Sequence, residues 1–256
     1  MGCGWAGNKN GFLKVSHRGF LCFILAVFLC CIRVPFSDAA QGDYLIVLHG
    51  IGRTNQNMQT VSDHFTAQGY LVLNLNYASR DKELKNLSTD IHQKITKFTT
   101  DPNKPIHFIT HSMGGLVARA YITQYKPKNI ARVVMLGPPN QGSEVADFFK
   151  ENWLFQGYYG PAGQQLKTDQ QMIKAVLGEV NFDLGVIAGD RSIDPVSSII
   201  IPGKDDGKVA IERTKVSGMA DHIVLHVTHT FMMKNKQVIE QAQYFIEHGF
   251  FKKTPQ

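Results

Sequence analysis

Cysteine is missing from most of this chain of 256 residues, because all four cysteines stand near its start, at Cys3, Cys22, Cys30 and Cys31. We interpret the first forty residues as a leader, and once such a leader is removed the chain has neither a thiol nor a disulfide. This absence excludes a cysteine nucleophile and a cysteine-based zinc site from the rest of the protein. The stability of the fold must then come from its hydrophobic core.

The sequence also lacks runs of basic residues and basic stripes interleaved with aromatic side chains. Its formal net charge is +6. However, Lys9, Lys14, Arg18 and Arg33 stand in the first forty residues, where only Asp38 opposes them. The rest of the chain is therefore only mildly basic, and we expect no nucleic-acid partner.

An apolar run at residues 19–32 follows the first basic residues and precedes the small-x-small pattern Ser37-Asp38-Ala39. The run is shorter than the ~20 residues that a helix needs to cross a bilayer. We therefore expect residues 1–40 to be a signal peptide that is cleaved after Ala39 and exports the protein to the periplasm or out of the cell. If it is not cleaved, it is a membrane anchor. Residues 41–256 are expected to form one globular domain.

After the leader, short apolar runs rich in β-branched residues alternate with longer amphipathic stretches. Strands that are apolar on both faces are typical of a parallel sheet covered by helices on each side. The pattern predicts an α/β fold with a doubly wound, mostly parallel sheet. The predicted strands are 44–48, 71–75, 106–110, 133–136 and 184–188, and the predicted helices are 55–68, 81–99, 113–124 and 234–248.

The alternation breaks between residues 140 and 180, where aromatic residues stand among glycines and a proline. One interpretation is a lid or a wall of an acyl-binding pocket; the other is a helical excursion whose aromatic side chains pack on the sheet. The aromatic residues of this insertion are Phe148, Phe149, Trp153, Phe155, Tyr158 and Tyr159.

The sharpest local pattern is THSMGG at residues 110–115, between a predicted strand and a predicted helix. A strand, a tight turn and a helix are the context of a nucleophile elbow, in which a strained serine holds its Oγ clear of the sheet. Small residues two positions before and after the serine relieve crowding. Gly114 meets the second requirement, whereas Thr110 stands where glycine is usual. The pattern predicts Ser112 as a nucleophile rather than part of an ordinary turn.

Acyl transfer also needs N–H donors for the oxyanion, and one of them is the amide after the nucleophile, here that of Met113. We expect the second from the glycine-rich loop after the first predicted strand, at the amide of Ile51, with His49 and Gly50 shaping that loop. A dinucleotide-binding fingerprint fails here because Asn55 stands where the third glycine would be.

A serine nucleophile needs a histidine as its base. In proteins with a nucleophile elbow, the acid and then the histidine come after the serine along the chain. The histidines after Ser112 are His222, His226, His229 and His248. His229 stands where a strand-like segment gives way to the last predicted helix, so we expect it to be the base. The first three could bind a metal on one face of a helix, but the β-branched residues between them favour a strand, and we expect no metal site.

Three aspartates are candidates for the acid that orients this histidine. Asp205 and Asp206 lie in a predicted tight turn, and Asp190 ends a predicted strand, where the acid commonly follows. An Asp-Gly pair is often no more than a turn former. The residues alone leave the choice open.

Together these motifs resemble the lipase and esterase branch of the α/β-hydrolase family, in particular bacterial triacylglycerol lipases and GPI inositol-deacylase-like hydrolases. The resemblance spans residues 43–248 and includes the oxyanion loop, the elbow and the segment DGKV at 206–209. In such lipases the aspartate that begins this segment is the triad acid and a later histidine is the base. The resemblance therefore implies Asp206 and His229 in these roles.

The resemblance further implies an esterase that acts through an acyl-enzyme and needs no cofactor. Its partner is expected to be a small-molecule or lipid ester, and the protein a monomer; contact with a membrane surface is left open. An acyltransferase or a thioesterase would use the same residues, and a fold relative without catalysis would serve as a binding module.

Overall fold

The computed structural model describes residues 1–4, 42–148, 153–168 and 170–253. All the elements given below belong to the compact unit Ala39–Gln256. Nearly all of the predicted leader, with its cleavage site, lies outside the described residues, and so does Phe149. In the described parts, no helix has both the length and the apolar character that a membrane crossing requires.

Within the described residues, six parallel strands form one sheet in the order β2-β1-β3-β4-β5-β6. They are β1 (Tyr44–Leu48), β2 (Leu71–Leu75), β3 (Ile106–His111), β4 (Ile130–Leu136), β5 (Asp183–Gly189) and β6 (Asp221–Leu225). The chain runs from β1 to one edge, returns past β1 to β3 and then continues to the other edge. Ligands of such sheets bind at the carboxyl ends of the strands near this reversal. The five predicted strands and the doubly wound α/β fold are confirmed.

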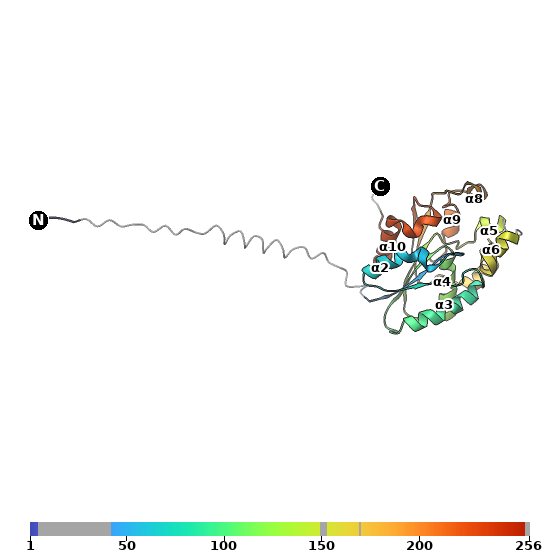
Figure 1. Ribbon diagram of the computed structural model, residues 1–256, viewed down its shortest axis with the longest axis horizontal. Coiled ribbons are helices and arrows are strands. Elements are labelled where there is room, and N and C mark those ends of the chain that lie inside the picture. Colours follow the sequence, from blue (N-terminus) through green and yellow to red (C-terminus); the bar gives the residue numbers. More distant parts are fainter. Residues whose placement is uncertain (5–41, 149–152, 169, 254–256) are drawn as a thin grey trace. The chain divides into compact units, whose positions relative to one another are not determined.

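Helices cover both faces of the sheet. The helices α2 (Gln59–Ala67) and α10 (Lys236–His248) lie on one face, and α3 (Leu84–Phe98) and α4 (Met113–Tyr125) lie on the other (Figure 1). Alternate residues of β1 point to opposite faces, and every one of them is buried. Each fully buried large apolar side chain contributes about 1.5–3 kcal/mol. The sheet therefore has a core on each side, which explains its continuous apolar strands.

The last helix begins later than predicted, because a 3₁₀ helix, η2 (His229–Lys234), precedes it. Asn235 separates the two helices, and its side chain accepts a hydrogen bond of 3.1 Å from the amide of Val238. Such a side-chain N-cap defines where a helix begins. His229 thus lies at the start of a short helical turn beyond the carboxyl end of β6.

The insertion lies between β4 and β5 and is held against the domain. Gln165 Oε1 accepts a hydrogen bond of 2.7 Å from the amide of Leu84, at the start of α3. Within the insertion, the carbonyl oxygen of Leu166 accepts a hydrogen bond of 2.8 Å from the amide of Ser143. The helices of the insertion are α5 (Glu144–Phe148), α6 (Trp153–Gln164) and α7 (Gln170–Leu177). The shorter remaining elements are η1 (Asn55–Met58), α8 (Pro195–Ile200) and α9 (Ile211–Thr214).

Candidate active site

Ser112 lies in a sharp turn between β3 and α4, with backbone angles φ 53° and ψ −128°. A positive φ is strained for a residue with a side chain, and the surrounding structure must hold it in place. The amide of Ser112 donates a hydrogen bond of 2.8 Å to the carbonyl of Leu136. A Cβ at Gly114 would lie 2.7 Å from the carbonyl oxygen of His49, so only glycine fits there. This is the geometry of the expected elbow.

Thr110, which stands where glycine is usual, is fully buried. A Cβ on Gly115 would lie 3.2 Å from its Oγ1 and 3.0 Å from the sulfur of Met135. The second glycine of the elbow therefore leaves the space that the threonine side chain occupies.

His229 and Asp206 form a close pair. Nδ1 of His229 lies 2.7 Å from Oδ2 of Asp206, and the amide of His229 donates to the Asp206 carbonyl at 2.8 Å. The other carboxylate oxygen accepts hydrogen bonds from the amides of Lys208 (3.0 Å) and Val209 (2.9 Å). Because a carboxylate accepts, the ring proton of His229 lies on Nδ1 and Nε2 is left as a proton acceptor.

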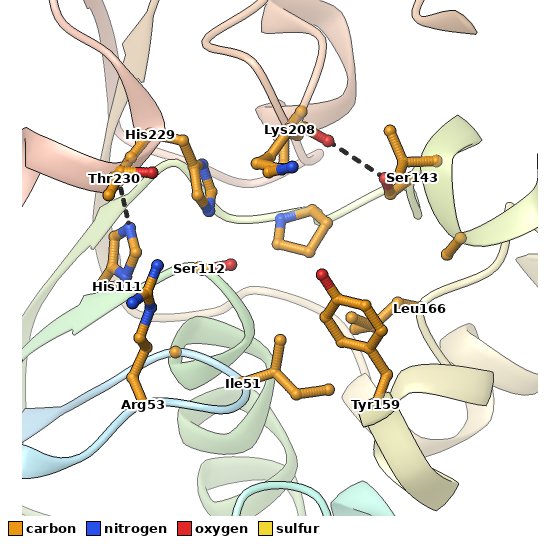
Figure 2. Close-up of a pocket in the computed structure, with 15 residues that line it drawn as sticks. Ile51, Arg53, His111, Ser112, Ser143, Tyr159, Leu166, Lys208, His229 and Thr230 are labelled. Carbon is orange, nitrogen blue, oxygen red and sulfur yellow. Dashed lines mark hydrogen bonds between the residues drawn. The ribbon is translucent and has the colours of Figure 1, made fainter. Parts of the chain in front are cut away.

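Ser112 and His229 line the same cavity, which has a volume of about 110 Å³. In Figure 2 the ring of His229 lies above the hydroxyl of Ser112. Asp206 contacts Nδ1 of this ring, and its side chain has no exposed surface. The structure thus brings together the three residue types that acyl transfer through a serine requires.

The two alternative acids bind other partners. Asp190 Oδ1 lies 2.9 Å from Nδ1 of His226, whose side chain is 75% exposed. Asp205 Oδ1 accepts hydrogen bonds from the hydroxyl of Ser198 (2.9 Å) and the amide of Gly207 (2.7 Å). Of the three aspartates, the geometry therefore favours Asp206 as the partner of His229.

The three neighbouring histidines do not share a strand as expected, because β6 ends at Leu225. His222 lies on that strand, and its Nε2 is 3.0 Å from Oγ1 of Thr214. His226 follows the strand, and His229 begins η2. Each ring therefore has a different partner. In the described parts of the chain, no group of His, Cys, Asp and Glu is placed to hold a metal ion.

The loop after β1 comes close to the nucleophile. A Cβ on Gly50 would lie 3.1 Å from the Cβ of Ser112, so the glycine allows the main chain to approach. Ile51 lines the cavity, and Met113 is the first residue of α4, where main-chain amides have no acceptor inside the helix. The two expected donors thus belong to segments that border Ser112.

His49 holds this loop in place. Its Nδ1 lies 2.8 Å from the carbonyl oxygen of Gly50, and the hydroxyl of Tyr77 donates a hydrogen bond of 2.5 Å to the His49 carbonyl. The two rings stack with their centres 4.2 Å apart. Burial lowers the pKa of His49, so the ring is neutral at pH 7. These contacts fit the supporting position that the sequence suggested.

The sequence reasoning missed His111, which is buried beside the nucleophile and lines the cavity. Its Nε2 lies 2.9 Å from the main-chain carbonyl oxygen of His229, and the two rings are 4.7 Å apart. Burial and then the adjacent His229 lower the pKa of His111 well below its ordinary value. Its position directly before Ser112 was the available signal.

The insertion supplies part of the cavity wall, since Tyr159 and Leu166 line it together with Val145 and Ala146. Figure 2 shows Tyr159 and Leu166 on one side of Ser112. Of the two interpretations of this segment, the wall of a pocket therefore agrees with the described residues.

Comparison with known proteins gives one family and one fold. The family model of palmitoyl protein thioesterase matches residues 45–179, which include the elbow and much of the insertion. No curated protein matches the chain.

Solved structures of hydrolases resemble the fold. The mature form of a lipase from Bacillus licheniformis is 16% identical, with a TM-score of 0.66 over 82% of this chain and 93% of that one. A metagenomic carboxyl esterase is 17% identical (TM-score 0.58, 75% and 65%). A phospholipase from Legionella pneumophila is 18% identical (TM-score 0.58, 69% and 45%). At these identities the likeness supports the α/β-hydrolase fold alone.

Proposed function

Because the chain belongs to the palmitoyl protein thioesterase family and is an ester hydrolase of the α/β-hydrolase fold, we propose that Ser112, His229 and Asp206 are its catalytic triad. One observation carries this proposal: Nδ1 of His229 lies 2.7 Å from Oδ2 of Asp206, and the ring of His229 lines the same cavity as the strained Ser112.

In the first half of the reaction, Oγ of Ser112 attacks the carbonyl carbon of the acyl ester while Nε2 of His229 takes its proton. The carbonyl–oxygen bond of the ester then breaks, and the same proton passes from His229 to the departing alcohol. In the second half, water adds to the acyl-serine in the same way and releases the acid. Asp206 keeps the ring in the required tautomer throughout.

The charge that develops on the carbonyl oxygen needs donors that are fixed in advance. We assign this role to the amides of Met113 and Ile51, because the first begins α4 and the second follows Gly50, the glycine that approaches Ser112. The positive end of α4 adds to the same stabilisation.

A fluorophosphonate probe tests the nucleophile. Wild-type protein should be labelled and Ser112→Ala should not, because the probe bonds only to an activated serine. Ser143→Ala is the matched control: Ser143 lines the same cavity, but its hydroxyl donates to the carbonyl of Lys208 at 3.2 Å. The control should still be labelled. Equal labelling of wild type and Ser112→Ala, or labelling of neither, would contradict the proposal.

A thioester is the second candidate substrate, and the family match favours it. The same triad attacks either bond, since only the leaving atom differs. To separate these substrates, hydrolysis rates are compared between an oxoester and a thioester that carry the same acyl group, for a series of acyl groups from butyryl to palmitoyl. Product analysis with added alcohol tests for acyl transfer.

We also propose that the first forty residues act as a signal for export.

We further propose that the protein contacts a lipid surface through Ile193, Val196 and Ile199. These apolar side chains on and before α8 are 60%, 61% and 87% exposed. The cavity residue Val145 packs with Ile201, directly after α8. Ile199→Asp should weaken cosedimentation with phospholipid vesicles, whereas Phe250→Ser, at another exposed apolar residue, should not.

A further inference from the structure

The charged side chains that line the catalytic cavity are all cationic. Among the described residues that line it, Arg53 and Lys208 are cationic and none is an aspartate or a glutamate. Lys208 is neutralised, because its Nζ lies 2.6 Å from Oδ2 of Asp194. In the described parts of the chain, by contrast, no carboxylate lies within ion-pair distance of Arg53. Of the two described cations that line this cavity, Arg53 is therefore the one without a carboxylate partner.

The position of Arg53 follows from the loop that borders Ser112. The amide of Arg53 donates a hydrogen bond of 3.3 Å to the carbonyl of Gly50, so the residue lies in the same tight turn as the expected oxyanion donor Ile51. The side chain is exposed, so a guanidinium can meet a ligand there without first losing a protein partner.

Arg53 and the wall formed by Tyr159 and Leu166 lie on opposite sides of the nucleophile (Figure 2). Figure 2 shows Arg53 and His111 on one side of Ser112, and Tyr159 and Leu166 on the other. The side with Tyr159 and Leu166 has the apolar character that an acyl chain requires. The other half of the substrate, which leaves as an alcohol or thiol, then faces the guanidinium.

We propose that Arg53 selects acyl esters or thioesters whose leaving group carries a phosphate or a carboxylate. This inference rests on the proposed function and adds the substrate class to it. The planar guanidinium can donate two parallel hydrogen bonds to either anion, a geometry that a lysine cannot copy. The reaction itself is unchanged: the carbonyl–oxygen or carbonyl–sulfur bond breaks, and the departing group takes the proton from His229 and keeps its anion.

Two aryl esters with the same acyl group test the proposal on the full-length protein. 4-Nitrophenyl butyrate is neutral, and 3-carboxy-4-nitrophenyl butyrate carries a carboxylate on the leaving group. The measured quantity is the ratio of their kcat/KM values, the anionic ester over the neutral one. Arg53→Gln should lower this ratio about fivefold or more, and Arg53→Lys should lower it less.

Lys97→Gln is the matched control, because it removes one exposed cation at the far end of α3 and does not touch the cavity. It should leave the ratio unchanged. For the wild type, the ratio should also fall as the ionic strength rises from about 0.02 M to about 0.5 M, since salt screens an exposed charge. A ratio that is insensitive to Arg53→Gln, or one that Lys97→Gln lowers equally, would overturn the proposal.

Two further substrates identify the source of the anion. An acylglycerol phosphate in micelles presents the phosphate on a lipid, and a soluble acyl thioester of a phosphorylated thiol presents it in solution. Arg53→Gln should lower the turnover of one of these substrates, and that substrate identifies the source of the anion. If the variant lowers the turnover of neither, the inference is wrong. If the proposed function itself fails, no ester is hydrolysed and Ser112 is not labelled, so the two failures are distinguishable.

Discussion

The imidazole of His111 donates a hydrogen bond of 2.9 Å from Nε2 to the main-chain carbonyl of His229. A carbonyl only accepts, so the proton of this ring is on Nε2, and its lowered pKa keeps the ring neutral. The residue before the nucleophile is thus bonded to the backbone of the proposed base, and we infer that it positions that base.

Replacing His111 by Phe removes this donor and leaves the carbonyl of His229 without its partner. We expect kcat to fall about tenfold or more with KM little changed, because small displacements of a catalytic group are costly. The free energy of unfolding should fall by about 1–3 kcal/mol. His111→Gln, which keeps an N–H donor, should restore part of kcat. Full activity in His111→Phe would show that the contact has no role in catalysis.

Asp206→Asn tests the acid that orients the base. The amide oxygen can take the place of Oδ1, which accepts from the amides of Lys208 and Val209, so the NH₂ group faces Nδ1 of His229 and favours the wrong tautomer. We expect kcat to fall about 10³-fold or more while the domain stays folded.

Asp190→Asn is the comparison for this experiment, since Asp190 pairs with the exposed His226 instead. Steady-state kinetics and circular dichroism of both variants check the assignment. If Asp190→Asn lost activity and Asp206→Asn kept it, the acid would have been assigned to the wrong residue.

The sequence predicted those parts of the site that depend on local pattern. The elbow at Ser112 needs a strand, a turn and a helix in succession, and all three are visible in neighbouring residues. The strands were predictable for the same reason, because burial on both faces requires a continuous apolar run.

The contacts that the sequence could not predict join distant segments. His111 and His229 are separated by 118 residues, and no periodicity links them. The end of β6 at Leu225 was also missed. The last residue pair of β5 and β6 is Gly189 with Leu225, but β-branched residues continue along the chain beyond it. The place of Arg53 beside the cavity likewise depends on how the oxyanion loop meets the elbow.

The two glycines of the elbow predict an ordered pair of destabilised variants. In Gly114→Ala the new Cβ would meet main-chain oxygens of Leu48 and His49 at 2.8 and 2.7 Å, so the backbone must shift. In Gly115→Ala it would meet the flexible side chain of Met135 at 3.0 Å. Urea unfolding should show a loss of about 1–3 kcal/mol for Gly114→Ala and a smaller one for Gly115→Ala. The reverse order would contradict the elbow geometry described above.

The pH dependence of stability should reflect four histidines whose pKa values burial lowers: His49, His107, His111 and His222. In the unfolded chain each titrates near 6.5. Below that pH the unfolded state binds protons that the folded state does not. The free energy of unfolding therefore decreases as the pH falls from about 6.5 toward the lower pKa values of the folded state. Each such proton contributes a slope of about 1.4 kcal/mol per pH unit.

The free energy of urea unfolding, measured at intervals between about pH 8 and about pH 5, gives this slope. His222→Gln is the informative variant, because it lies outside the cavity and its amide can still bond to Thr214. Removing this partly buried imidazole should reduce the proton uptake on unfolding by up to one proton and flatten the curve accordingly. A stability that rises as the pH falls from 6.5 would show that these rings are protonated in the folded protein and that burial does not decide their state.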